Sequence, residues 1–433
     1  MKEVAPKLSD QPNPSKRESL ESGVSAEMDR HNGFIFLLCF SLLYFVAPVA
    51  AVDVVQAGLC TKLGASAVIA NLPASAYLLG CFVPIFISRM IPPRLERTAL
   101  VGACLATSVS LGSVCILMLL PVANAVRIGV LIAQGSVAGL ASSVFNVYFY
   151  QCLGRGTSGP GRAKAFKLAF TWSPVAAIIG SLGAQFVLGH RIPSLVFPFD
   201  FAVVYFIGAI GAAALAFAAS RFELMPINGR RETQPLVRYM IETAKSFFGV
   251  RRLALLWIAY VLWYLVLTAM PTMSLFTRMT VGKEPAALSF LIMAIRYAGK
   301  SVGGFVLGAI MVRYGFRAPL AACVALVGLG VLWTWGVPGY AFLIAFAFMG
   351  AGELGGAYFS NYVVSESGPE NGARNMSVLM LATPVVSIGP IIYGSLNQHY
   401  GYPASFAFGI LVALPALWIV LTLPARHQDE GRA

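Results

Sequence analysis

The sequence predicts an all-α membrane protein of twelve transmembrane helices, and three observations lead to this prediction. Hydrophobic residues make up 58% of the 433 positions and charged residues only 11%, whereas a soluble domain carries roughly 25% charged residues. Twelve apolar segments are long enough to cross a bilayer. Most Lys and Arg residues gather in the connections on one side of the predicted membrane.

The twelve apolar segments follow one another through most of the chain. A membrane helix needs about 20 mostly apolar residues. The predicted spans are 33–58, 67–88, 97–121, 126–152, 164–189, 198–220, 252–277, 286–312, 318–336, 339–365, 375–397 and 403–424. The first run has no clear small-residue cleavage site, so it is interpreted as a true span and not as a removed signal peptide.

The positive charge indicates the orientation. An N-terminus placed inside the cell puts 24 of the 31 Lys and Arg residues on the cytoplasmic side and five outside, while Arg296 and Lys300 remain within a span. Cytoplasmic loops normally carry this excess. We therefore expect a multi-pass protein of the cell membrane with both termini in the cytoplasm. The net charge of +13 then faces anionic lipid headgroups and not nucleic acid. The lack of long loops suited to glycosylation favours a bacterial inner membrane.

The spans divide six and six around the longest polar loop. We predict a disordered cytoplasmic tail at 1–32, six-helix bundles at 33–221 and 252–424, a linker at 222–251 and a cytoplasmic tail at 425–433. Apolar residues recur in the linker at helical spacing: Leu236, Met240, Ile241, Ala244, Phe247 and Phe248. This spacing predicts an amphipathic helix on the cytoplasmic surface. A helix packed on the bundle fits it equally well.

Short motifs repeat at corresponding positions of the two halves. Ser173-Pro174-Val175 in the fifth span matches Thr383-Pro384-Val385 in the eleventh. The fourth span contains Gly135-xxx-Gly139 and the tenth contains Gly352-xxx-Gly356. Internal repetition of this kind is typical of transporters built from two bundles around a central path.

The six-loop-six pattern over residues 33–424 resembles the major facilitator superfamily. The sharpest local match follows the eighth span, where four residues fit a cytoplasmic signature of that family: Gly308, Arg313, Gly315 and Arg317. Val312 occupies the position at which the signature has an acidic residue. In the first half of the chain, Arg89 corresponds to a basic residue of the same signature. The resemblance implies that these loops hold the inward gate, that the two bundles rock in alternating access, and that the protein is a monomer.

Two cations lie inside the eighth span. Arg296 and Lys300 are four residues apart, so they share one face of a helix. A charge at mid-membrane costs about 2.5–3.5 kcal/mol on insertion scales and normally faces a cavity or a partner. Two like charges on one face also repel each other unless an anion or an acid neutralises them. They therefore predict a binding site for an anionic substrate group, with ion pairing to acids on neighbouring helices as the alternative.

Two acids also lie within spans. Glu353 is midway along the tenth span among several glycines, and an acid at this depth suits a proton carrier in coupled transport. The alternative is a salt bridge from Glu353 to Arg296 or Lys300. The two interpretations are compatible if protonation of Glu353 breaks that salt bridge. Asp53, near the outer end of the first span, is interpreted as a second coupling acid, as a substrate ligand or as an interfacial acid in contact with outside water.

Uncharged polar residues complete the predicted substrate contacts. Tyr260 and Tyr264 share one face of the seventh span, and Gln134 and Asn146 lie near one face of the fourth. Such faces suggest the walls of a cavity. The same residue types also hold helices together by hydrogen bonds.

Together these features predict a secondary active transporter of a small organic solute, an anion, working by alternating access with proton coupling. The alternative is a proton-driven exporter of drugs or lipophilic cations that relies on Glu353 and Asp53. Exporters of the family carry a Gly-Pro motif in the fifth span, whereas Ser173 precedes Pro174 here. A non-transporting receptor is a third interpretation.

No enzyme motif is present. The chain lacks HExxH, Gly-x-Ser-x-Gly and a phosphate-binding loop, so we expect neither an enzyme nor a cofactor. Its seven cysteines include no CxxC pair, which favours packing over a metal site or a disulfide scaffold. The expected partners are a small-molecule substrate and the lipid bilayer.

Overall fold

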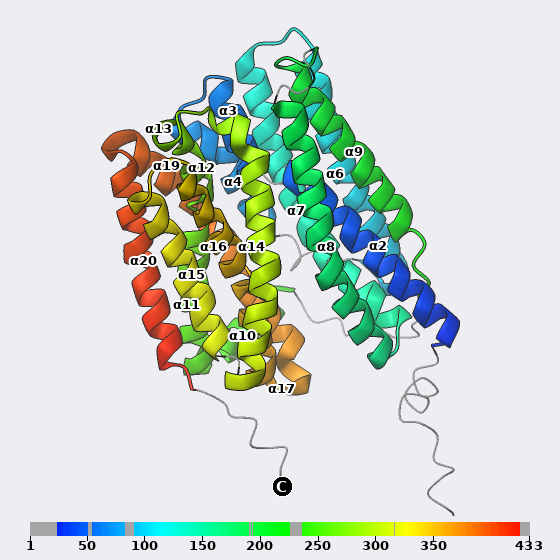
Figure 1. Cartoon of the computed structure of the whole chain (residues 1–433). Helices are drawn as coiled ribbons and strands as arrows, with labels where there is room; N and C mark the ends of the chain where they lie inside the picture. Colours follow the sequence, from blue (N-terminus) through cyan, green and yellow to red (C-terminus); the bar gives the residue numbers. More distant parts are fainter. Residues whose placement is uncertain are drawn as a thin grey trace, which may run out of the picture.

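The computed structural model describes residues 24–50, 54–82, 91–189, 192, 194–225, 236–315 and 317–424. In these ranges every regular element is helical. Eleven of the described helical spans are long and apolar enough to cross a bilayer, and α4 (Ala67–Gly80) is a shorter apolar helix. The predicted fold of twelve helices in two bundles is therefore confirmed, and Figure 1 shows the bundles side by side.

The N-terminal bundle contains six spans. They are α2 (Ala26–Ala50), α4, α6 (Glu96–Leu119), α7 (Asn124–Gly156), α8 (Gly159–Leu188) and α9 (Phe199–Ala219). Helix α2 packs against α8 and α9, α6 packs against α7 and α9, and α4 packs against α7. The short helices α3 (Val55–Lys62) and η2 (Pro93–Leu95) lie between spans.

The C-terminal bundle contains the other six spans, and three of them are interrupted. The elements are α11 (Arg251–Leu267), α12 (Met270–Leu275), α13 (Thr277–Thr280), α14 (Pro285–Tyr314), α15 (Arg317–Gly336), η3 (Gly339–Leu343), α16 (Ile344–Gly352), α17 (Gly355–Met380), α18 (Ala382–Val385), η4 (Val386–Ile388), α19 (Gly389–Tyr400) and α20 (Tyr402–Thr422). Helix α14 packs against α16, and α20 packs against α11 and α15.

Glycines bring paired helices into backbone contact in both bundles. A Cβ at Gly135 or Gly139 of α7 would collide with the carbonyl oxygens of Pro73 and Tyr77 in α4. In the second half, a Cβ at Gly350 of α16 would collide with a backbone carbonyl of α14. Small residues at such positions permit close approach of membrane helices. The glycines of the repeated motif are not equivalent in their contacts, because Gly352 faces Val327 of α15 and Gly356 faces Trp263 of α11, whereas Gly350 makes the close contact with α14.

The described ends of the chain, at α2 and α20, lie at one end of the molecule, called here the terminal end (Figure 1). Hydrogen bonds between the described parts of the two bundles lie toward the other end, called the distal end. The side chain of Gln185 in α8 donates to the Ala287 carbonyl at 2.6 Å and accepts from the Leu291 amide at 2.8 Å. Thr272 donates to Asn71 at 3.4 Å. These contacts join the bundles at the distal end.

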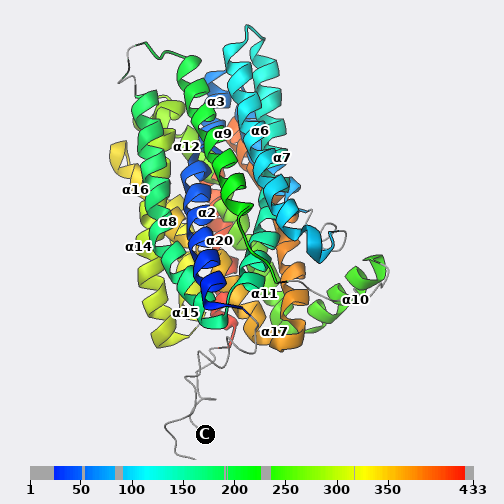
Figure 2. The same ribbon diagram turned by 90° about the vertical axis from the view of Figure 1, so that its right-hand side faces the viewer.

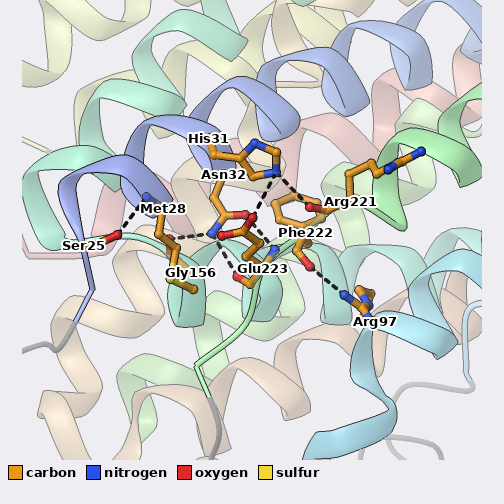
Figure 3. A network of polar contacts seen from close by, with 9 residues as sticks. All are labelled: Ser25, Met28, His31, Asn32, Arg97, Gly156, Arg221, Phe222 and Glu223. Atoms are coloured by element: carbon orange, nitrogen blue, oxygen red, sulfur yellow. Dashed lines mark hydrogen bonds and ion pairs between the residues drawn. The ribbon is translucent and has the colours of Figure 1, made fainter.

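Residues that follow α9 are tied to the N-terminal bundle at the terminal end (Figure 3). Asn32, fully buried, donates to the carbonyls of Gly156 at 2.7 Å and Glu223 at 2.9 Å, and it accepts from the Glu223 amide at 3.0 Å. Arg97 donates to the Phe222 carbonyl at 3.0 Å. The side chain of one asparagine thereby satisfies backbone groups that the helices leave unpaired.

The predicted helix of the linker is present as α10 (Leu236–Gly249). Figure 2 shows it reaching sideways from the base of the C-terminal bundle. Its last turn is anchored there, because Phe247 is buried and the ring of Phe248 meets Trp257 at a centroid distance of 5.5 Å. Ile241, by contrast, is half exposed. Location at a membrane surface remains a prediction for this helix.

Candidate functional site

A cavity of about 390 Å³ lies between the two bundles and is lined by residues of both. Its volume falls in the usual range of small-molecule sites, roughly 300–1,000 Å³. The walls are mostly apolar, and a set of polar residues converges on the cavity. These polar residues are Tyr77, Thr107, Ser142, Tyr260, Tyr264, Thr268, Arg296, Tyr297 and Glu353.

Two charged side chains, Arg296 and Glu353, line this cavity, and Lys300 contacts Glu353 beside them. Nε of Arg296 lies 3.1 Å from Oε2 of Glu353, and Nζ of Lys300 lies 3.4 Å from Oε1 of the same carboxylate. The Arg296 side chain is 8% exposed, that of Lys300 18% and that of Glu353 27%. The ion pairs considered at the sequence level are therefore formed. Both oxygens of the acid contact a cation.

An aromatic ring from the other bundle borders the same cluster. Nζ of Lys300 lies 5.8 Å from the ring centroid of Tyr44 in α2, within the range of a cation–π interaction. The Tyr44 ring also meets Tyr297 at a centroid distance of 5.7 Å. The charge cluster of the C-terminal bundle thus touches the N-terminal bundle and can respond to relative movement of the two.

The helical interruptions of the C-terminal bundle lie at the cavity. The seventh span breaks between α11 and α12, next to Thr268, and the tenth breaks between α16 and α17, at Glu353 itself. The eleventh passes through η4 before α19, where Pro390 lines the cavity. In transporters, substrate and ion sites typically form where spanning helices are discontinuous. Backbone groups freed at such breaks become available to the site or to neighbouring side chains.

Trp263 stabilises the break that carries Glu353. Its Nε1 donates to the carbonyl of Gly352 at 3.2 Å, an acceptor at the last residue of α16. The indole also fills the space beside Gly355, where a Cβ would lie 2.8 Å from a ring carbon. The break is therefore a packed and hydrogen-bonded feature of the interior.

The other predicted substrate contacts divide between the cavity and its surroundings. Tyr260 and Tyr264 line the cavity as expected. The residues that line the cavity do not include Gln134, which is buried and accepts a hydrogen bond from the side chain of Gln56. Asn146 is exposed and also lies apart from the lining. The residue types of Gln134 and Asn146 and their spacing on one helix do not indicate that both lie apart from the cavity.

Two predicted residues, Asp53 and Arg89, lie outside the described residues. The signature after the eighth span lies where α14 ends and α15 begins, at the terminal end. Gly315 has a φ of 72° and ends α14, a conformation that glycine adopts without strain. Arg313 is exposed, with its guanidinium 5.4 Å from the Tyr314 ring centroid. A gating role for this loop remains a prediction.

The C-terminal part of the chain, residues 280–433, matches the family model of the Major Facilitator Superfamily. From α14 to its C-terminus the chain is therefore similar in sequence to that family. This match and the long apolar helices support a multi-pass membrane protein. The match also agrees with the two bundles, the cavity between them and the helical interruptions at that cavity.

Solved structures of transporters share this fold. A point mutant of the nucleoside transporter NupG superposes with a TM-score of 0.68 and 13% identity over 92% of this chain and 99% of that chain. The D-xylose-proton symporter gives a TM-score of 0.67 and 14% identity over 91% and 98% of the two chains. A POT family transporter in complex with 5-aminolevulinic acid gives a TM-score of 0.67 and 14% identity over 90% and 95%. At these identities the likeness establishes the fold.

Sequence reasoning missed the helical breaks and the role of Trp263. A signal for the breaks exists in the sequence, since Gly350, Gly352 and Gly355 surround Glu353 and a Gly-Pro pair opens α19. Glycine and proline are, however, also frequent in continuous membrane helices. Which of them interrupt a helix therefore depends on the neighbours that satisfy the freed backbone.

Proposed function

We propose that this protein is a proton-coupled secondary transporter of a small organic anion. The observation that supports the proposal is a cluster of two cations and one acid, of which Arg296 and Glu353 line the cavity. Arg296 and Lys300 approach the same carboxylate, Glu353, at 3.1 and 3.4 Å. Charges inside a membrane protein usually mark a substrate or ion pathway.

The cluster offers a direct physical link between a proton and an anion. While Glu353 is ionised, it occupies both cations and competes with an incoming anion for them. Protonation removes its negative charge, which frees Arg296 and Lys300 to bind a carboxylate or phosphate group. Release of the proton restores the ion pairs and expels the anion. Binding of a proton and binding of an anion would then favour each other, as linkage requires.

The exporter alternative receives less support from the same geometry. A lipophilic cation would need an acid with a free oxygen, yet both oxygens of Glu353 contact cations. A cation entering the cavity would also meet two positive charges. The aromatic wall of Tyr260 and Tyr264 alone favours neither class of substrate.

Alternating access is the transport mode that the two bundles suggest. Hydrogen bonds of Gln185 and Thr272 join the bundles at the distal end. With both termini in the cytoplasm, as the distribution of Lys and Arg predicts, the distal end faces outward. The arrangement then corresponds to a state closed to the outside. In this view the loop with Arg313 and Arg317 contributes to closure of the inner side in the opposite state.

The proposal is tested by thermal stability of the purified full chain across a library of carboxylates, phosphates and lipophilic cations. A ligand at about 100 times its dissociation constant should stabilise the protein by roughly 2.7 kcal/mol. Anions are expected to stabilise the wild type but not Arg296→Ala. The matched control is Arg278→Ala, because Arg278 pairs with Glu284 in an exposed loop and should keep the response.

Two other results would contradict the proposal. Stabilisation by lipophilic cations alone, lost in Glu353→Gln, would identify an exporter. Stabilisation by anions that is equal in wild type and Arg296→Ala would place the anion elsewhere in the molecule.

A further inference from the structure

The N-terminal bundle contributes one wall of the cavity, opposite the charge cluster of the C-terminal bundle. This wall contains alanines from five helices, called here the alanine pocket: Ala47, Ala74, Ala103, Ala138, Ala141 and Ala212. Leu43, Val46 and Leu215 border it. The alanine pocket lines one continuous space with Arg296 and Glu353.

Polar groups near the alanine pocket are already hydrogen-bonded within the protein. The Thr107 hydroxyl donates to the Ala103 carbonyl of its own helix at 3.1 Å. The Tyr77 hydroxyl donates to Ser142 at 3.1 Å. A ligand group against this wall therefore meets mainly methyl groups, aliphatic chains and the Phe145 ring, and gains from apolar burial.

The small side chains of the pocket also require a physical reason. Protein interiors are close-packed, and apolar walls that face empty space lose dispersion contacts. Larger side chains would fill this space, as Phe36, Phe149 and Leu153 do elsewhere in the core of the N-terminal bundle. Six alanines from five helices around one space indicate room kept for an apolar group that arrives with a ligand.

We propose that the transported solute is an amphipathic anion. Its anionic group binds at Arg296 and Lys300, and its aliphatic or aromatic body enters the alanine pocket. This inference rests on the proposed function and narrows its substrate class. It argues against sugar phosphates and other polyhydroxylated anions, because most of their hydroxyl groups would face alanine methyl groups, with only Tyr77, Thr107 and Ser142 as polar neighbours on this wall.

The test uses the full chain in lipid nanodiscs and a series of simple probes. Butanoate, hexanoate and octanoate are compared with their primary amides, and dissociation constants are obtained from thermal stability against ligand concentration. The dissociation constant of the carboxylates should fall roughly fourfold for each added CH₂ group, the value for full apolar burial. The amides of equal length should bind more weakly, because they lack the charge.

Variants in which leucine replaces an alanine of the pocket test whether the pocket receives the ligand chain. Ala103→Leu places a bulkier side chain in the pocket, and its matched control is Ala106→Leu, at an exposed position of the same helix. Ala138→Leu and Ala133→Leu form a second pair on α7, again one cavity-lining and one exposed position. The pocket variants should lose the gain with chain length yet still bind butanoate. The controls should retain the full series, which also separates binding from partition of the probes into lipid.

Each outcome separates the two proposals. Carboxylates that bind equally at every length, with binding lost in Arg296→Ala, would overturn the amphipathic substrate and leave the anion site standing. Amides that bind as tightly as carboxylates, with a chain-length gain lost in Ala103→Leu, would overturn the anion site and leave the apolar pocket. A chain-length gain that persists in both pocket variants would show that lipid, and not the alanine pocket, receives the chain.

Discussion

Gly350 of α16 lies directly against the backbone of Arg296 in α14, leaving no room for a Cβ between them. The contact sets the separation of the two helices that carry the charge cluster. Three residues beyond Gly350, Glu353 meets the side chain of Arg296 at 3.1 Å. The ion pair thus depends on a glycine that carries no charge.

Gly350→Ala should therefore push α14 and α16 apart and weaken both the fold and the charge cluster. Overpacking of this kind costs typically about 1–3 kcal/mol, and it should lower the midpoint of thermal unfolding. Gly304→Ala is the control, because the nearest atom to a Cβ there is 3.9 Å away. That variant should be neutral or slightly stabilising. Equal losses in the two variants would contradict the role assigned to the close contact.

Trp263→Phe should destabilise the break at Glu353. The substitution leaves the buried carbonyl of Gly352 without its donor, a loss of about 1–3 kcal/mol. Trp333→Phe removes a comparable hydrogen bond, to the Ala341 carbonyl at 3.0 Å, but at an exposed site. Its effect should be smaller because water replaces the lost donor. Thermal unfolding of both variants checks the comparison, and a larger loss for Trp333→Phe would argue against a special role of Trp263.

Gln185→Leu should loosen the closed distal end. The wild-type side chain accepts a hydrogen bond from the Leu291 amide and donates to the Ala287 carbonyl, both in the first turns of α14. Hydrogen exchange of the segment 285–291, followed by mass spectrometry, should become faster in this variant. Gln398→Leu, at an exposed position of α19, should leave the exchange unchanged. An unaltered rate in Gln185→Leu would mean that other contacts hold this end closed.

Glu353→Gln should separate substrate movement from proton movement. The amide keeps the size of the side chain but neither ionises nor carries a proton. In proteoliposomes, uptake driven by a pH gradient should be lost, while exchange of labelled for unlabelled solute at equal pH should continue. Wild-type uptake should rise as the pH on the substrate side falls, and uptake by the variant should not depend on pH. A variant with wild-type pH-driven uptake would falsify the role of Glu353 as the coupling acid.

Fold and site differ in how far the sequence predicts them. The spans follow from hydropathy, because a bilayer demands long apolar helices whatever their packing. The sequence also predicts the charge cluster as one of two alternatives, because few partners exist for Arg296 and Lys300 inside a membrane. Gln134 shows the limit of this reasoning. A polar residue on an interior helix face can bond to a neighbouring side chain, as Gln134 does to Gln56, and need not face a ligand.

The alanine pocket could not be predicted for a related physical reason. Alanine is common in membrane helices, and a single small residue such as Ala103 packs against a neighbour or borders a space according to the helices around it. Only the assembled bundle brings Ala103 and Ala212, more than one hundred positions apart, to the same cavity. The helical breaks near Thr268 and Glu353 could not be predicted for the same reason, because their stability depends on residues distant in the chain.

The stoichiometry of the charge cluster bears on the electrical behaviour of transport. One acid, Glu353, faces Arg296 and Lys300, so in the proposed mechanism one proton would exchange for one unit of negative charge on the solute. A monoanion that crosses with that proton moves no net charge through the membrane. A potential of 100 mV, which acts on an unaccompanied charge with about 2.3 kcal/mol, would then leave the direction of transport to the pH and solute gradients alone.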